Sequence, residues 1–393
     1  MKKILVITPR FPYPVVGGDR LRIYEICKVL AKYYSVTLVS LCENYLEMNY
    51  IVPDDKVFSS VHRVYLPKWK SYLNCLLSLS SSKPLQVAYY QSKQLKKIVE
   101  SMSESHDLVL PHLIRTAEYA KNLNVKKILE MTDAISMNYS RISLLNNNAG
   151  LKGFIYHIER NRLNKYEKKI ARYFDCNVLV SSIDRDFLYA NSNLDLCNTL
   201  VCSNGVDLSK FSYEFIPNGK KLVFIGNMYS AQNFDAAYWF AKNVLPIIRQ
   251  YDNYEFHVIG KIPTDGSRKL TRIPGVVVTG AVENVGEIAR GALAGICSVR
   301  LAAGVQNKIL EYMALGIPTI TSSTGLEGLF AEENVSVLVA NKIEEYVNHI
   351  LMLKKNANFA EMIARNAFCY VKEHHSWDEK LKPLINKIDE ILK

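Results

Sequence analysis

The stretch GICSVRLAAGVQNKILEYMALGIP, residues 295–318, is the part of the chain that decides the fold class. Residues 295–299 are apolar except for Ser298 and predict a short β-strand, which a loop containing Gly304 follows. From residue 306 to 315 the apolar residues recur at helical spacing, and Gly316 ends the helix. A buried strand, a glycine-containing loop and an amphipathic helix are typical of a parallel sheet that is covered by helices.

The same alternation of apolar runs and helical patterns extends in both directions along the chain. The further strands are expected at residues 3–8, 36–41, 61–66, 108–111, 127–130, 177–180, 199–202, 222–226, 255–260, 275–279, 318–322 and 336–339. The sequence therefore predicts an α/β protein with two doubly wound domains, 1–205 and 206–375. A last helix, 376–393, is expected to return to the first domain. Ligands bind beyond the carboxyl ends of such strands, so we expect two sites that face each other across a cleft.

Composition restricts the class of protein further. With 393 residues, of which 49% are hydrophobic, the chain has enough apolar content for two cores. It has no run of about 20 apolar residues of the kind that spans a membrane. The apolar run at residues 4–7 is too short for the core of a secretion signal, and the eight cysteines form no CxxC pair. We expect a cytoplasmic protein with free thiols.

The net charge of +11 is concentrated in the first half of the chain. Residues 1–210 hold 29 Lys and Arg against 19 Asp and Glu, whereas residues 211–393 hold 20 against 19. A basic half indicates an anionic partner, and charge alone does not choose between nucleic acid and an anionic membrane or phosphorylated lipid. No nucleic-acid motif accompanies the charge, so we expect no nucleic-acid partner.

Two segments offer candidate binding chemistry. On the helix from 306 to 315, Lys308 and Glu311 are three residues apart and share a side. A carboxylate there can accept two hydrogen bonds from a vicinal diol such as a ribose, although spacing alone favours a plain surface Lys–Glu pair. Gly17 and Gly18 follow the first strand and precede a helix, where free N–H groups favour an anion. Without GxGxxG spacing, an ordinary turn is equally open.

Several motifs, in order along nearly the whole chain, resemble glycosyltransferase family 4, and most closely its branch for capsule and exopolysaccharide synthesis. They are the Gly17-Gly18 loop, Asn204-Gly205-Val206-Asp207, Phe224-Ile225-Gly226-Asn227-Met228 with Asn233-x-Asp235, Val258-Ile259-Gly260, and Gly304-x3-Lys308-x2-Glu311-x4-Gly316-x-Pro318 with Glu327-Gly328-Leu329. The resemblance implies a GT-B fold with two facing Rossmann-like domains. It also implies a retaining transfer from a nucleotide diphosphate sugar, without a metal or other cofactor.

The resemblance assigns roles to individual residues. Glu311 matches the carboxylate that takes the donor ribose hydroxyls, and Lys261 lies where contacts to the base and diphosphate cluster. His112 matches a histidine near the reacting sugar carbon. The diphosphate and sugar are expected to lie against two backbone segments, Gly17 with Gly18, and Gly304 with Val305 and Gln306.

The chain departs from the family pattern at the phosphate-binding positions. The family's E-x7-E pair has Ala303 in place of its first glutamate. An Arg and a Lys that many members carry are replaced by Asn227, which stays a donor-binding candidate, and Gln232. Because the leaving diphosphate still needs positive charge, we expect Arg300 and Lys308 to supply it.

Other features favour a structural interpretation. Asp184-Arg185-Asp186 has the form of a metal-binding DxD, but its position at a helix start favours a solvated helix end. His374-His375 has no companions at metal-ligand spacing, so no metal site is expected, and Trp377 is interpreted as a packing anchor. The apolar segment 69–79, flanked by lysines, is interpreted as a core helix, and a membrane-surface segment is the alternative. The basic helix 160–172 faces either anionic lipid or solvent.

These observations lead to one functional hypothesis and two alternatives. We expect a glycosyltransferase that moves a sugar from a nucleotide diphosphate donor to a hydroxyl of a glycan acceptor, one that is linked to lipid at the inner face of the cell membrane. A nucleotide-sugar epimerase of the same fold would turn over donor without an acceptor. A non-catalytic nucleotide-sugar or glycan-binding protein is the other alternative, and Ala303 is the argument for it.

Overall fold

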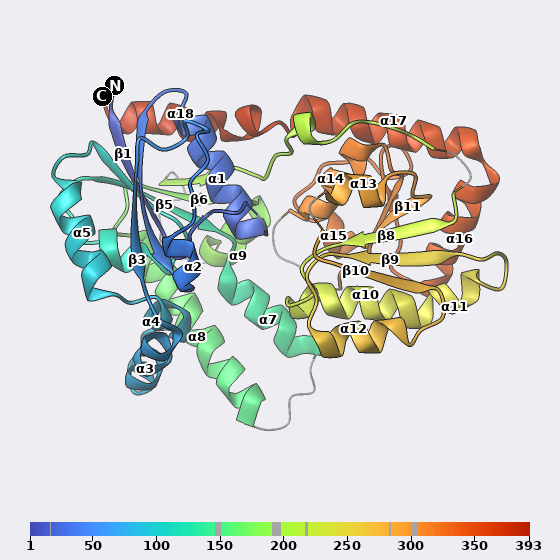
Figure 1. The fold of residues 1–393 in the computed structure, drawn as a ribbon, viewed down its shortest axis with the longest axis horizontal. Coiled ribbons are helices and arrows are strands. Elements are labelled where there is room, and N and C mark those ends of the chain that lie inside the picture. The colour runs from blue at the N-terminus through green and yellow to red at the C-terminus, as the bar shows by residue number, and fades with distance from the viewer. Residues whose placement is uncertain (16, 146–150, 191–197, 217–218, 283, 301–304) are drawn as a thin grey trace. The chain divides into compact units, whose positions relative to one another are not determined.

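The computed structural model describes the chain except for residues 16, 146–150, 191–197, 217–218, 283 and 301–304 (Figure 1). The described residues divide into two compact units. Unit 1 contains residues 1–203 and 381–393, and unit 2 contains residues 204–380. Each unit is built on one parallel sheet. None of the described helices has the length and apolarity needed to span a bilayer.

Unit 1 has a sheet of strand order β3-β2-β1-β4-β5-β6-β7, in which every neighbouring pair is parallel. The strands are β1 (Lys3–Thr8), β2 (Ser35–Cys42), β3 (Ser60–Tyr65), β4 (Leu108–Pro111), β5 (Lys126–Thr132), β6 (Cys176–Leu179) and β7 (Thr199–Val201). β1, β2 and β4 are buried along almost their whole length, as strands covered on both faces must be. The strand order reverses between β1 and β4.

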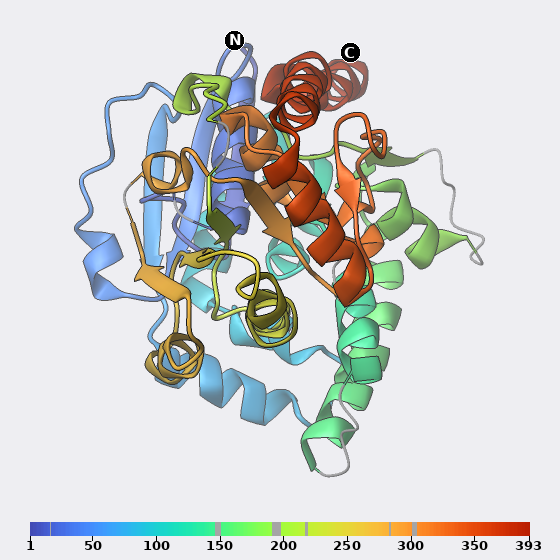
Figure 2. The same ribbon diagram turned by 90° about the vertical axis from the view of Figure 1, so that its right-hand side faces the viewer.

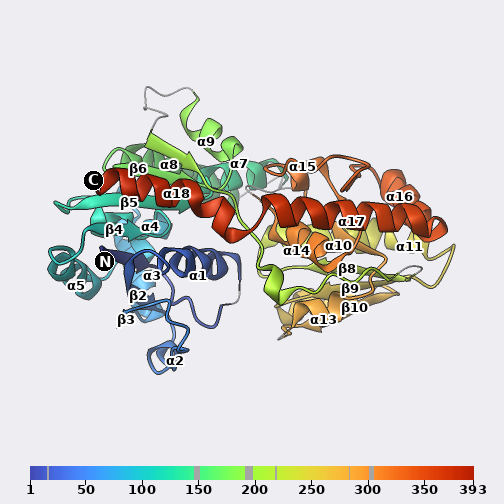
Figure 3. The same ribbon diagram turned by 90° about the horizontal axis from the view of Figure 1, so that it is seen from above.

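Helices connect these strands. They are α1 (Gly18–Leu30), α2 (Tyr45–Met48), α3 (Lys68–Ser78), α4 (Leu85–Tyr89), α5 (Lys93–Ser103), α6 (Ala117–Ala120), α7 (Ile135–Leu145), α8 (Leu151–Ala171) and α9 (Ser182–Tyr189). The last helix, α18 (Trp377–Ile391), begins in unit 2 and ends in unit 1. Figure 3 shows it beside the strands of unit 1. Asp389 accepts a hydrogen bond from the Tyr34 hydroxyl, and the Leu392 carbonyl accepts one from Lys2, so the C-terminal helix returns to the first unit as expected.

Unit 2 repeats the same topology with strand order β10-β9-β8-β11-β12-β13, again all parallel. The strands are β8 (Lys221–Ile225), β9 (Glu255–Ile259), β10 (Val276–Gly280), β11 (Ala294–Cys297), β12 (Thr319–Thr321) and β13 (Leu338–Val339). The helices are α10 (Ala231–Asn243), α11 (Leu245–Ile248), α12 (Thr264–Thr271), α13 (Val285–Ala289), α14 (Asn307–Leu315), α15 (Ser323–Leu326), α16 (Ile343–Lys355) and α17 (Ala357–His374). A 3-10 turn, Leu208–Lys210, precedes them. Figure 1 shows α13 and α14 on one side of the sheet, and α10 and α12 on the other.

The structure corrects several sequence expectations. The helical pattern over residues 86–104 suggests one helix, but the structure has two, α4 and α5, because Ser92 caps a new helix by accepting a hydrogen bond from the Leu95 N–H. Asp184 is fully buried, so the interpretation as a solvated helix start is wrong for this residue. The segment 69–79 is not a core helix, because α3 leaves its large apolar side chains exposed.

Candidate active site

The reversal of strand order in unit 2 lies between β8 and β11, and their carboxyl ends carry the candidate donor residues. Gly226 and Asn227 follow β8, and Arg300 lies three residues beyond the end of β11. The next described segment opens α14, with Val305 buried and Gln306 as the residue before the helix. The expected contacts of Gly304, and the altered position Ala303, lie outside the described residues.

Tyr312 of α14 holds β8 and β11 apart at this point. The two strands pair only at Leu222 and Val223, and beyond them the Tyr312 hydroxyl takes the place of the missing strand contact. It accepts a hydrogen bond from the Ile225 N–H at 2.9 Å and donates one to the Ile296 carbonyl at 3.2 Å. A Cβ on Gly295 would lie 2.3 Å from the Tyr312 ring, so the glycine is what allows the ring to enter. Sequence reasoning missed Tyr312, although a glycine inside a strand can indicate such a close approach.

Lys308 is a buried cation at the first turn of α14. Its side chain is 7% exposed, and its Nζ donates to Asn233 Oδ1 at 3.1 Å and to Gln306 Oε1 at 3.0 Å. The Nζ also lies 5.3 Å from the centre of the Phe224 ring. Within the described part of the chain, both of its hydrogen-bond partners are neutral amide oxygens. A buried ammonium that lacks a bonded carboxylate is suited to an anionic ligand.

Glu311 lies one turn further along α14 and is only partly exposed. Burial raises the pKa of its carboxyl to about 7, and the charge of Lys308 opposes the rise. No described residue donates a hydrogen bond to this carboxylate. Both sequence-predicted residues therefore lie on one side of α14, as the spacing implied, but they do not form the solvent-exposed ion pair of the simpler interpretation.

Arg300, by contrast, already has a carboxylate partner. Its guanidinium donates to both oxygens of Asp235, at 2.7 and 3.2 Å, and lies 5.8 Å from the Trp239 ring centre. The side chain is 41% exposed. Its positive charge is thus partly neutralised before any ligand binds, which makes Lys308 the stronger candidate for stabilising a diphosphate.

The loops after β8 and β9 approach each other closely. Gly260 has φ +129°, and a Cβ there would lie 2.0 Å from the Gly226 carbonyl oxygen, so only glycine fits. The next residue, Lys261, is exposed, and its carbonyl accepts the Met228 N–H at 2.7 Å. Asn227 orders the same loop, since its side-chain oxygen accepts the Tyr229 N–H at 3.1 Å. The structure thus brings Asn227 and Lys261 to one edge of the sheet.

The corresponding edge of unit 1 carries His112, directly after β4. Its Nδ1 lies 2.6 Å from Glu130 Oε2, and Arg22 Nε donates to the other oxygen of the same carboxylate at 2.8 Å. Thr132 adds a hydroxyl and an N–H donor to Glu130. Burial opposes ionisation of this carboxyl, but Arg22 and His112 outweigh it and lower its pKa to about 2. Sequence reasoning identified His112 but not the buried pair Glu130 and Arg22.

An ionised Glu130 determines how His112 presents its ring. A carboxylate accepts hydrogen bonds only, so Nδ1 must carry the proton toward Glu130. The neutral ring then offers Nε2 as an acceptor, and the protonated ring offers it as a donor. Among the described residues, this Nε2 is buried without a hydrogen-bond partner. It is therefore suited to a ligand hydroxyl.

The Gly17-Gly18 loop opens α1 at the same edge. Gly17 has φ +101° and precedes the helix. Because glycine has no side chain, it cannot cap the first N–H groups of α1. Close by, Arg10 contacts Asp19 at 3.2 Å. Burial disfavours the charged form of Asp19, but Arg10, Arg115 and His112 prevail and lower its pKa. The exposed glycines therefore lie beside a mixed cluster of charges rather than a purely cationic one.

The motifs given a structural interpretation have structural contacts. Asp184 accepts the Ala134 N–H at 2.8 Å, and His375 is buried between the Asn204 carbonyl and the Tyr370 hydroxyl. Trp377 is 5% exposed, as a packing anchor should be, and its backbone lies so close to Gly205 that a Cβ there would come within 2.7 Å of the Trp377 nitrogen. Across the described residues, no three His, Cys, Asp or Glu side chains gather in a way that could hold a metal ion.

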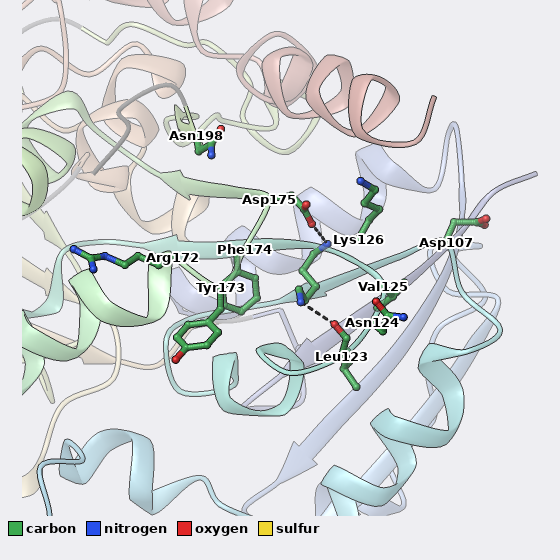
Figure 4. Close-up of a pocket in the computed structure, with 11 residues that line it drawn as sticks. Asp107, Leu123, Asn124, Val125, Lys126, Arg172, Tyr173, Phe174, Asp175 and Asn198 are labelled. Atoms are coloured by element: carbon green, nitrogen blue, oxygen red, sulfur yellow. Dashed lines mark hydrogen bonds between the residues drawn. The ribbon is translucent and has the colours of Figure 1, made fainter. Parts of the chain in front are cut away.

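A hollow of about 690 Å³ lies at the opposite edge of the unit 1 sheet (Figure 4). Lys126, Asp175 and Asn198 line it, and they stand at or just before the starts of β5, β6 and β7. The Lys127 ammonium in its wall is already bonded to the Leu123 carbonyl at 2.8 Å. Because ligands of doubly wound sheets bind at the carboxyl edge, this hollow is not the candidate active site.

Comparison with known proteins identifies the chemistry of unit 2. Residues 219–356 match the model of the family Glycosyl transferases group 1. The chain carries a group 1 glycosyltransferase domain. The matched region contains most of the motif residues described above in unit 2: Asn227, Lys261, Arg300, Lys308 and Glu311. An uncharacterized 44.6 kDa protein in the cps region of Klebsiella pneumoniae is 23% identical over 390 residues, which cover 95% of this chain and 97% of that protein.

Solved structures of glycosyltransferases share the fold of the whole chain. The structure is similar to sucrose-phosphate synthase from Thermosynechococcus elongatus, with a TM-score of 0.76, 13% identity and coverage of 100% and 99% of the two chains. Anabaena HepE in complex with UDP and glucose has a TM-score of 0.70, 12% identity and coverage of 99% and 100%. A mutant of S. aureus TarM in complex with fondaparinux, alpha-GlcNAc-glycerol and UDP has a TM-score of 0.70, 12% identity and full coverage of both chains. The expected α/β fold of the GT-B type is confirmed.

Proposed function

We propose that this glycosyltransferase is a retaining, metal-independent enzyme that moves a sugar from a nucleotide diphosphate sugar to a hydroxyl of a lipid-linked glycan. The acceptor would be a precursor of a surface polysaccharide, assembled in the cytoplasm at the inner face of the cell membrane. The relative from a Klebsiella cps region supports the link to capsule synthesis. The UDP found with HepE and TarM makes a uridine donor the first to test.

The observation that carries the proposal is that Lys308 and Glu311 lie on one side of α14, beside the reversal of strand order. The carboxylate of Glu311 has no hydrogen-bond donor among the described residues and is suited to the two hydroxyls of a ribose. Lys308, one turn closer to the start of the helix, is suited to the diphosphate. A diol and an anion are the groups that the ribose and the diphosphate of a nucleoside diphosphate present.

The proposed chemistry rests on the departure of the diphosphate. Negative charge develops on it as the bond to the sugar breaks, and Lys308 with the N-terminal end of α14 would stabilise that charge. Arg300 would add its charge if the diphosphate competes with Asp235. The acceptor hydroxyl would attack from the side of the leaving group, which retains the anomeric configuration.

Unit 1 would contribute the remaining contacts. We propose that Gly17 and Gly18 take part in holding the diphosphate and sugar, and that His112 Nε2 receives a hydrogen bond from a sugar hydroxyl. The proton on Nδ1, held by Glu130, keeps Nε2 available for this role.

Two measurements test the proposed function. Thermal-shift screening and calorimetry with a panel of nucleotide sugars, UDP-glucose first, should show one donor that binds and stabilises the protein. The bound donor is then incubated with and without membrane extract that contains lipid-linked saccharides. Transfer that requires the extract supports the proposal, turnover of donor alone indicates an epimerase, and binding without any turnover indicates a binding protein.

A further inference from the structure

Helix α3 of unit 1 is amphipathic in the reverse sense of an ordinary surface helix. The side that faces the protein carries Ser71, Asn74, Cys75 and Ser78, of which the two serines are buried. The side that faces away carries five large apolar residues, and a sixth follows the helix. They are Trp69 (63% exposed), Tyr72 (65%), Leu73 (45%), Leu76 (64%), Leu77 (71%) and Leu79 (52%). A helix that buries serines and exposes leucines loses hydrophobic stabilisation in water. Such an exposed apolar surface indicates a binding partner outside the chain.

The contacts of the buried side show that this orientation is fixed. Asn74 donates to the Gln91 carbonyl at 3.0 Å, and the Cys75 thiol lies 3.5 Å from the Leu85 carbonyl. At the end of the helix, Arg162 of α8 donates to the Leu79 carbonyl at 2.6 Å. These polar contacts would break if α3 rolled its apolar side inward. Figures 1 and 2 show α3 at the lower rim of unit 1, beyond α4.

The stretch of sequence that contains α3 carries charge of one sign. Residues 56–99 contain eight Lys and Arg and no Asp or Glu. Two of the lysines, Lys68 and Lys70, are exposed in the first turn of α3, where positive charge opposes the helix dipole. Their position therefore does nothing for the helix and suits an anionic surface outside the protein. Lys70 also lies 5.6 Å from the Trp69 ring centre, at the border between the charged and apolar parts.

We propose that α3 is a membrane-docking helix that lies in the surface of an anionic bilayer, with Trp69, Leu73, Leu76 and Leu77 among the acyl chains and Lys68 and Lys70 at the headgroups. Tryptophan and tyrosine favour the boundary between acyl chains and headgroups, and lysines at that boundary are attracted by anionic lipid. A second copy of this chain fits less well, because a symmetric contact through this face would bring two segments of net positive charge together. An acidic protein partner is the alternative that the test must exclude.

The position of α3 links the bilayer to the candidate site. α3 follows the carboxyl end of β3, at the same edge of the sheet as His112. Tyr72 contacts Tyr89 of α4 with ring centres 5.9 Å apart, and Tyr89 contacts Tyr90 at 4.9 Å. The Tyr90 hydroxyl in turn accepts a hydrogen bond from Arg10, which is paired with Asp19 at the start of α1. Docking through α3 thus fits the proposed lipid-linked acceptor. The biological role of the docking rests on that proposed function, whereas the membrane binding itself does not.

Vesicle binding by the full chain tests the proposal directly. Flotation with vesicles of phosphatidylcholine and phosphatidylglycerol should recover the protein at low salt, and neutral phosphatidylcholine vesicles should recover far less. Of the three tryptophans, Trp69 is the one more than half exposed, so vesicle binding should shift its emission to the blue and brominated acyl chains should quench it. The Trp69→Phe variant should still bind vesicles but lose that signal.

Variants then assign the binding to α3. Replacing Leu76 and Leu77 by Gln should lower the partition coefficient at least about tenfold, since two inserted apolar side chains are lost. Replacing either Lys68 or Lys70 by Gln should lower it about fivefold. Phe330→Gln, which alters an apolar side chain that is 88% exposed in unit 2, is the matched control and should bind as the unchanged protein does.

The outcomes separate this proposal from the proposed function. Nucleotide-sugar affinity, measured by calorimetry without vesicles, should be the same in the α3 variants and the unchanged protein. Loss of vesicle binding with intact donor affinity supports the docking helix. No binding to anionic vesicles, equal binding to neutral ones, or unchanged binding of the Leu76→Gln/Leu77→Gln variant would overturn it, whatever the donor assays show. Self-association that the same variant abolishes, without vesicle binding, would assign the surface to a second copy.

Discussion

Glu311 makes the affinity for the donor depend on pH in a range where few carboxyl groups titrate. Burial raises its pKa to about 7, and only the ionised carboxylate can accept both ribose hydroxyl protons. With that pKa, the ionised fraction falls from about nine-tenths at pH 8 to about one-tenth at pH 6. The affinity for UDP-glucose should therefore fall about tenfold over this range, which is about 1.4 kcal/mol.

The assay is isothermal titration calorimetry from pH 6 to pH 8 with UDP-glucose, whose phosphodiester groups do not titrate there. Binding near pH 7 should release a proton, so the measured heat should change with the ionisation enthalpy of the buffer. Glu311→Gln should remove both effects. Glu311→Ala should weaken binding at pH 8 by about 2–4 kcal/mol, because two hydrogen bonds to a charged acceptor are lost.

A control variant isolates the effect of the site. Glu361 is an exposed glutamate on α17 that pairs with Arg365, so Glu361→Gln should keep the pH profile of the unchanged protein. If the affinity is flat from pH 6 to pH 8 and Glu311→Gln binds as tightly as the unchanged protein, Glu311 does not hold the ribose and the reasoning fails.

Three further predictions concern residues that organise the two edges. Tyr312→Phe should lower the free energy of unfolding by about 2–4 kcal/mol in urea titrations, because the Ile225 N–H and the Ile296 carbonyl lose their partner in a buried position; a loss below 0.5 kcal/mol would show that water replaces it. Lys308→Ala should slow transfer at saturating donor about 100-fold, and more than Arg300→Ala does, since Asp235 already neutralises Arg300; the reverse order would move the phosphate contact to Arg300. Glu130 has a pKa lowered to about 2, so it stabilises the fold above the usual glutamate range, and this contribution is lost as the pH falls toward 2. Glu130→Gln should be less stable at pH 7 and lose less stability on acidification in thermal unfolding, and an unchanged acid profile would contradict this.

The sheets could be predicted well because most strands are short apolar runs bounded by polar residues. β1 and β4 have the predicted bounds, since both are buried along nearly their whole length and both end at the edge where ligand loops begin. Helices were harder to predict where polar contacts decide them. Glu167 of α8 accepts the Ile135 N–H at 2.7 Å and so fixes the start of α7, a helix that the sequence pattern did not predict. Such a cap is supplied by a residue 32 positions away, which no local pattern reveals.

The residues of the candidate site likewise differ in whether local sequence spacing predicts their contacts. Lys308 and Glu311 share a helix, so their spacing alone places them together. Tyr312 lies beside them in sequence but acts through the gap between two strands, and that gap exists only in the folded sheet. Glu130 and Arg22 are 108 positions apart and meet through the order of strands in unit 1. The charge of Arg300 could be predicted from the sequence, whereas its neutralisation by Asp235, 65 positions away, could not.

The orientation of α3, with its apolar side exposed, shows that a hydrophobic pattern alone does not say which side of a helix is buried. The spacing of Leu73, Leu76 and Leu77 is that of one helix face, and it is equally compatible with a face that packs inward. What decides the direction is the opposite face, where Asn74 finds a backbone carbonyl and the small residues Ser71 and Ser78 allow close packing. The hydrogen bond of Asn74 offsets the cost of burying its amide, whereas apolar side chains can stay exposed until a partner outside the chain covers them. The acid-free sequence around α3 then indicates that this outside partner is anionic.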